Sequence, residues 1–237
     1  LKELWEFSEH TMRGQTFNKQ GDLRFTILLQ ITAAVSKIIQ SALAQISQNS
    51  FYGLGIMLRP LVEGLINYMY IEGDSSQIRA KTFVIDDNRS RLANVRKLIP
   101  LLERNQAPGM STVTDAERFR QLETQLVQEQ NELITLYGKS NLKFPSIEER
   151  ARASGCIETY ATAYWLLCQE THLTARGLDK YMSIKNGHLS ITWDYHLDLF
   201  HVYIRTFYII FLAFLTECSK TFGIPNIKDL NQFETIP

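Results

Sequence analysis

Apolar residues recur at the spacing of an α-helix along almost the whole chain, and this periodicity constrains the fold more than any other feature. The segment that follows Asp22, a favourable N-cap, carries apolar side chains on one helix face at Leu28, Ile31, Val35, Ile38 and Ala42. No stretch alternates apolar and polar residues for long, as a half-buried strand would. We therefore expect an all-α fold, a bundle of about seven helices with long central helices.

The expected helices follow from this periodicity and from their start and stop signals. They cover roughly residues 2–12, 22–49, 51–71, 76–105, 115–137, 146–177 and 192–222, with a turn at "IKNGHLS" before the last one. Pro60 and Pro100 lie inside two of them, and we expect a kink or a break at each. Ser146 and Glu149 have capping-box spacing. We expect one domain over residues 1–237, with a core at about 22–222 and peripheral ends at 1–20 and 224–237.

Composition excludes several classes of protein. The chain has 45% hydrophobic and 21% charged residues, as is typical of a soluble globular protein. Its 25 basic and 25 acidic residues give no net field that would attract nucleic acid. The charged start "LKELWEFSEH" is unlike a signal peptide, and the apolar run 206–216 is about half of the roughly 20 residues that a membrane span needs. We therefore expect a cytoplasmic protein with no membrane partner.

The cysteines favour the same compartment. Cys156, Cys168 and Cys218 lie far apart in helical sequence and form no CxxC pair. Such a pattern indicates buried thiols in a reducing environment. It does not indicate a zinc site or a redox dithiol.

Three otherwise apolar helices each carry one line of polar side chains. Steps of three or four residues, which keep side chains on one helix face, join Arg59, Glu63, Asn67 and Tyr70; Tyr160, Tyr164, Cys168 and His172; and Asp194, Asp198, His201 and Arg205. Each line is either the solvated side of an amphipathic helix or one wall of a polar cavity inside the bundle. Leu58, Leu61, Val62, Leu65 and Ile66 surround the first line, and a single buried charge there would cost several kcal/mol, so partners must converge on it.

Familiar catalytic motifs are absent from the sequence. There is no P-loop, no GxGxxG and no GxSxG, and we expect no cofactor. Asp194, Asp198 and His201 share a helix face and are weak candidates for a metal site, but no HExxH or ExxH pair supports it. The HEPN ribonucleases carry an arginine four to six residues before a histidine, and no such pair precedes His172.

Four stretches together resemble a bacterial family known only as a domain of unknown function, number 5677. They read MLRPLVEGLINYMYI, IRAKTF, FPSIEERARASG and YATAYWLLCQETH, in the expected order within residues 20–220. The residues that match the family pattern are Arg59, Glu63, Tyr70, Arg79, Phe83, Tyr160, Tyr164 and His172. Cys168 stands where the family usually has serine. The resemblance implies an all-α bacterial cytoplasmic protein, associated with defence or toxin modules, and no established activity.

These observations leave three hypotheses for function. The first is a binding or effector module whose polar centre takes a small anionic ligand, with Arg59, Glu63, Arg79, Tyr160, Tyr164 and His172 as candidate ligand-binding residues. The second is a hydrolase or HEPN-like nuclease with His172 as the catalytic general acid or base. The third is a homo-oligomer that assembles through the aromatic last helix, for which plain core packing is the alternative.

Overall fold

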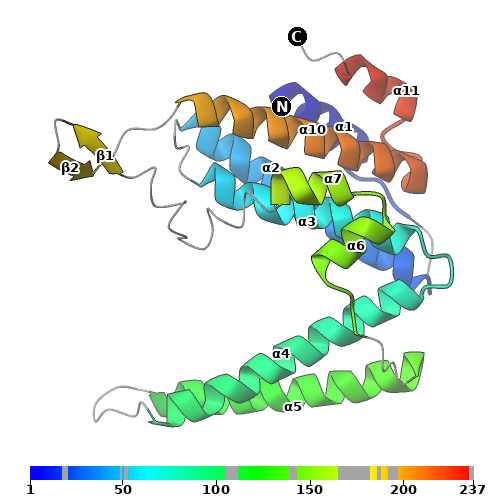
Figure 1. Ribbon diagram of the computed structural model, residues 1–237. Helices are drawn as coiled ribbons and strands as arrows, with labels where there is room; N and C mark the ends of the chain where they lie inside the picture. The colour runs from blue at the N-terminus through cyan, green and yellow to red at the C-terminus, as the bar shows by residue number, and fades with distance from the viewer. Residues whose placement is uncertain are drawn as a thin grey trace. The chain divides into compact units, whose positions relative to one another are not determined.

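The computed structural model describes residues 1–17, 21–48, 50, 53–104, 112–138, 143–164, 182–185, 188–191 and 197–234. The protein is all-α, as predicted, apart from one small pair of strands (Figure 1). By its internal contacts the chain divides into two compact units. The first joins Leu1–Gly73 to Ser146–Pro237, and the second is Asp74–Pro145.

The first unit is built from helices of very different lengths. They are α1 (Lys2–Met12), α2 (Leu23–Ser47), α3 (Leu54–Glu72), α6 (Ile147–Ala153), α7 (Ile157–Thr159), a π-helical turn (Tyr160–Tyr164), α10 (Leu197–Phe222), α11 (Ile227–Leu230) and a 3-10 turn (Asn231–Phe233). Two starts follow the predicted caps. The Asp22 carboxylate accepts a hydrogen bond from the Phe25 amide, and Ser146 and Glu149 form a complete capping box.

The core of this unit forms where α3 packs against both α2 and α10. Its fully buried side chains include Leu58, Leu61, Val62, Ile66, Phe207, Phe211 and Phe214. Gly64 allows the close approach of α2, because a Cβ at that position would lie 2.9 Å from Val35 Cγ2. The end segments, which we expected to be peripheral, also place Leu4 and Leu230 in the core.

Neither Pro60 nor Pro100 breaks its helix, since α3 and α4 (Ile78–Arg104) both run through the proline, and a kink stays the prediction at each. The structure corrects two other sequence expectations about element boundaries. The helix expected over 146–177 instead ends at Ala153. There Gly155 adopts a positive φ of 76°, a conformation that stops a helix.

The second correction concerns the segment for which we expected only a turn. Two strands, β1 (Met182–Lys185) and β2 (His188–Ile191), pair antiparallel with Met182 opposite Ile191 and Lys185 opposite His188. The sequence between the strands is Asn-Gly, the dipeptide that most favours a two-residue hairpin loop. The Asn-Gly dipeptide could therefore have predicted this hairpin from the sequence.

The second unit is a helical hairpin made by α4 and α5 (Thr112–Tyr137), which lie along each other (Figure 1). Its buried cluster is Val95, Ile99 and Leu126, with Leu92, Phe119 and Leu122 packed against it. These residues form the apolar contact between two otherwise polar helices. Exposed ion pairs also join the two helices, as at Arg96–Glu123 and Arg120–Glu103.

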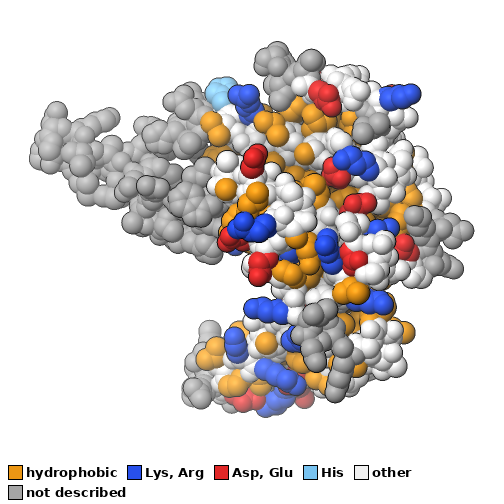
Figure 2. Space-filling model, turned by 45° about the vertical axis from the view of Figure 1, so that its right-hand side comes forward, with side chains coloured by type: hydrophobic (Ala, Val, Ile, Leu, Met, Phe, Trp, Pro, Cys, Tyr) orange, Lys and Arg blue, Asp and Glu red, His pale blue; other side chains and the backbone are white. Residues whose placement is uncertain are grey.

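Within the described residues, two helices are long and apolar enough to cross a membrane by length and composition, α2 and the segment Phe200–Phe222 of α10. The outward side of α2 nevertheless carries only small or polar side chains. Its exposed residues are Thr26, Gln30, Ala33, Ala34, Lys37, Gln40, Ser41, Ala44 and Ser47. On the face drawn in Figure 2, basic and acidic side chains are interspersed rather than gathered by sign.

Candidate functional site

The polar face of α3 meets two other elements of the first unit, α6 and the π-helical turn. Glu63 Oε1 lies 3.8 Å from Arg150 Nη2, and Asn67 accepts a hydrogen bond from Arg150 Nη1. One turn earlier on α3, Arg59 Nη2 donates to the Tyr164 hydroxyl at 3.3 Å. Arg59, Glu63 and Asn67, which share one face of α3, therefore contact protein groups and not bulk water alone. One of those groups, Tyr164, belongs to the second predicted line of polar residues.

Arg150 is the most deeply buried charge in this cluster. Its side chain is 9% exposed, whereas that of its partner Glu63 is 38% exposed. Its Nε also donates to the Ser146 carbonyl oxygen at 3.4 Å, so the capped start of α6 orients the guanidinium. A buried guanidinium requires such partners, because removing it from water costs several kcal/mol.

Arg59 and two tyrosines form a layered arrangement. The Arg59 Cζ lies 5.4 Å from the centroid of the Tyr164 ring, within cation–π distance. The Tyr160 and Tyr164 rings stack with centroids 5.2 Å apart and planes 23° from parallel. Both tyrosines lie in the π-helical turn Tyr160–Tyr164, a rare geometry that occurs frequently at functional sites.

The described cluster contains side chains of a kind that bind anions. Arg59 lies on the polar face of α3, and Arg150 of α6 contacts the same face. In this stretch α3 contributes one carboxylate, Glu63. Guanidinium groups bind carboxylate and phosphate oxygens through paired hydrogen bonds. The arrangement is therefore suited to binding an oxyanion, and its phenol groups add further hydrogen-bonding capacity.

Other predicted site residues fall outside this cluster. Tyr70, on the same helix, is buried. Arg79 belongs to the second unit, where its backbone amide donates to Asp74 Oδ2 at 2.8 Å. Burial acts to raise the pKa of Asp74, but hydrogen bonds from the Ser76 hydroxyl and from the Arg79 and Ser76 amides outweigh it and lower that pKa.

Several predictions lie beyond the described residues. These are His172, Cys168, Asp194 and the side chain of Asp198. His201 and Arg205, the described members of the third polar line, are exposed on α10. Within the described part of the chain, no group of three or more His, Cys, Asp or Glu side chains could hold a metal ion.

The described cysteines are buried thiols, as predicted. Cys156 and Cys218 are both free and buried. Burial raises the pKa of the Cys218 thiol to about 12 and also raises that of Cys156. The Cys156 Sγ lies 3.1 Å from the Met69 Sδ, and the Cys218 Sγ lies 3.6 Å from the Thr32 hydroxyl. Both thiols are therefore core groups with little thiolate character at neutral pH.

Sequence reasoning missed Arg150. The residue lies three positions after Ile147 and next to Ala151, which is fully buried, so helical spacing from the capping box places it on the inward side of α6. This spacing could have identified Arg150 as an inward-facing residue from the sequence. The identity of its partners, Glu63 and Asn67, depends on how α6 packs against α3 and is not encoded locally.

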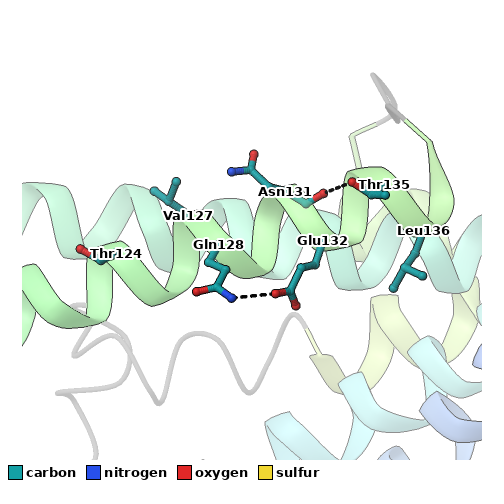
Figure 3. A pocket seen from close by; sticks show the side chains of 7 residues that line it. All are labelled: Thr124, Val127, Gln128, Asn131, Glu132, Thr135 and Leu136. Carbon is teal, nitrogen blue, oxygen red and sulfur yellow. Dashed lines mark hydrogen bonds between the residues drawn. The ribbon is translucent and has the colours of Figure 1, made fainter.

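A surface hollow of about 590 Å³ lies along α5, in the second unit (Figure 3). Its described lining residues all come from that one helix: Thr124, Val127, Gln128, Asn131, Glu132, Thr135 and Leu136. Gln128 donates to Glu132 at 2.9 Å, which occupies polar groups that would otherwise meet a ligand. The described lining is one helix face, and we assign this hollow no ligand.

Comparison with known proteins identifies the family and nothing more specific. No curated protein and no solved structure matches the chain. The model of a family of unknown function, DUF5677, matches residues 25–189, more than half of the chain. This range includes Arg59, Glu63, Asn67, Arg150 and Tyr164. The chain belongs to the DUF5677 family.

Proposed function

We propose that the protein is a binding module that recognises a small anionic ligand at the polar face of α3. The observation that carries this proposal is the pair of guanidiniums on one face, Arg59 beside Tyr164 and Arg150 beside Glu63. Glu63 is the carboxylate that α3 contributes beside Arg150. A guanidinium group can bind the oxygens of an oxyanion through paired hydrogen bonds.

Partial burial strengthens such a site. Arg59 is half-buried and Tyr164 almost fully buried, so a ligand anion would meet these groups where water screens charge weakly. The Tyr164 oxygen accepts a hydrogen bond from Arg59, which holds the guanidinium at this face. A charge-assisted hydrogen bond of this kind contributes about 1.5–3 kcal/mol.

The test is binding of inorganic phosphate, measured by calorimetry, to the wild type and to Arg59→Gln. We expect the variant to bind about tenfold or more weakly, because it loses a charged donor. Arg152→Gln is the matched control. It removes one positive charge from α6, but at an exposed side chain whose partner is Glu148, and it should bind as the wild type does. Equal affinity of wild type and Arg59→Gln, or no binding by either, would refute the proposal.

The alternative function, a hydrolase or HEPN-like nuclease with His172 as general acid or base, rests on the sequence. It predicts turnover of a phosphoester or an RNA substrate that His172→Ala abolishes while phosphate affinity is kept. A binding module predicts no turnover by the wild type. Measuring both quantities on the same preparation separates the two functions.

We further propose that the protein acts in the bacterial cytoplasm. The small and polar exposed side of α2 supports contact with water rather than lipid, since a lipid-facing side would be apolar. An effector role in phage defence stays a prediction from the family resemblance. Phage challenge of cells that express the wild type or Arg59→Gln would test it.

A homo-oligomer formed through the last helix also stays a prediction. Phe207 and Phe211 pack in the core, and the Tyr208 hydroxyl donates to the Phe233 carbonyl oxygen at 2.5 Å. Among the described side chains of α10, Val202 and Ile209 are exposed large apolar residues. Sedimentation of the wild type and of Ile209→Glu would show whether that face associates.

A further inference from the structure

We propose that Arg150 is a positioning residue for the anion site: it directs the Glu63 carboxylate toward α6, so that this negative charge does not act beside Arg59. The inference rests on the proposed function, because it concerns the affinity of the Arg59 face for an anion. It goes beyond that function by assigning different roles to the two arginines.

The contacts of Arg150 carry the first step. Its Nη1 donates to the Asn67 side chain, its Nε donates to the Ser146 carbonyl oxygen at 3.4 Å, and its Nη2 lies 3.8 Å from Glu63 Oε1. The first two contacts orient the guanidinium without any help from Glu63. Because the guanidinium is planar and rigid, its third nitrogen then presents positive charge at a set place beside the carboxylate.

Glu63 is the more adaptable member of this pair. Its side chain is 38% exposed, whereas that of Arg150 is 9% exposed. Within the part of the chain that the structure describes, Arg150 is the basic residue that pairs with Glu63. A partly exposed side chain has several rotamers available, so the place of the carboxylate depends on the charge that attracts it.

The alternative place for the Glu63 carboxylate is beside Arg59. Arg59 precedes Glu63 by four residues, the spacing at which opposite charges pair along a helix. Helical side chains also lean toward the N-terminus, which directs Glu63 toward the turn that contains Arg59. Arg59 itself is held at Tyr164, to whose hydroxyl it donates at 3.3 Å. A carboxylate that moved there would repel a bound anion and compete with it for the same guanidinium.

The charge of Glu63 should therefore matter for anion binding only when Arg150 is absent. Calorimetry with inorganic phosphate tests this on the wild type, Glu63→Gln, Arg150→Gln and the double variant. We expect Glu63→Gln to change the affinity by less than about twofold and Arg150→Gln to weaken binding by about fivefold. The double variant should bind within about twofold of the wild type, because the competing carboxylate is gone. A purely structural role would not produce this rescue, since the double variant lacks both partners of the ion pair.

The matched control is Glu148→Gln. It removes a carboxylate from α6 whose partner is the exposed Arg152. It should leave the affinity of the wild type unchanged and should not rescue Arg150→Gln. Thermal unfolding of each variant reports on the fold, and Arg150→Met, which keeps an apolar stem, replaces Arg150→Gln if that variant does not fold.

The outcomes separate this inference from the proposed function. An equal loss from Arg150→Gln with and without Glu63→Gln, or no loss at all, would overturn the positioning role and leave the anion site standing. A gain of more than about fivefold from Glu63→Gln alone would overturn it as well, because Glu63 would then already act at Arg59 in the wild type. That measurement needs no Arg150 variant. Failure of the wild type to bind phosphate would overturn both proposals.

Discussion

The hairpin of α4 and α5 and the polar face of α3 both place arginines beside glutamates, but the settings differ. In the hairpin, Arg96 lies 2.8 Å from Glu123, and its side chain is 56% exposed. At α3, Arg150 lies 3.8 Å from Glu63, and its side chain is 9% exposed. We expect loss of the shorter pair to cost less stability, because water and salt screen exposed charges. The burial of the arginine side chain, rather than its distance from the carboxylate, therefore indicates which charged residue the fold depends on.

The largest effect that we predict concerns the hairpin core. Leu126→Ala removes a side chain that is 1% exposed and should destabilise the packing of α4 on α5 by about 3 kcal/mol. We expect the two units to unfold independently. After this substitution, hydrogen exchange should show that backbone amides of α4 and α5 lose protection, whereas those of α2 and α3 keep it.

Leu136→Ala serves as the control on the same helix. Its side chain is 71% exposed, so the substitution should change stability by less than about 0.5 kcal/mol. Equal loss of protection in α3 and in the hairpin after Leu126→Ala would show that the two units unfold together.

The next effect concerns the buried arginine. Arg150→Ala removes the partner of Glu63 and Asn67 and should lower the free energy of unfolding by about 2 kcal/mol, less than for a fully buried pair because Glu63 is partly exposed. Denaturant titration measures it. Arg152→Ala, two positions along the same helix at an exposed site, should cost about 0.5 kcal/mol or less. A loss of the same size in both variants would contradict the distinction drawn from burial.

The smallest effect concerns the exposed pair. Arg96→Gln should change the free energy of unfolding by about 0.5 kcal/mol, despite the short contact with Glu123. The difference from wild type should shrink further in 1 M salt, where the screening length is about 3 Å. A salt-independent loss of more than about 1.5 kcal/mol would mean that the hairpin charges are as structural as Arg150.

Local rules predicted most of the helices. The Asp22 cap and the Ser146–Glu149 capping box set two helix starts. At Pro60 these rules left a kink or a break open, and α3 continues through the proline, which lies on an exposed side of the helix.

The site was predictable only in part. Helical spacing brought Arg59 and Glu63 to one face of α3, and the resemblance named Tyr164, which the structure places against Arg59. Arg150 escaped prediction because its role depends on contacts with Glu63 and Asn67, 87 and 83 positions earlier in the sequence. Tertiary packing selects such partners, and no local pattern records them.

The central claim is that the face of α3 binds an anion and that the hairpin, although it is richer in exposed arginines, does not. Nuclear magnetic resonance of the arginine Nε–Hε groups during a titration with inorganic phosphate tests it most directly, with each signal assigned by an arginine-to-lysine variant. The account predicts saturable shifts for Arg59 and Arg150, and constant signals for Arg96 and Arg120. Shifts at Arg96 and Arg120 as large as those at Arg59, or no shift at Arg59 up to saturating phosphate, would contradict it.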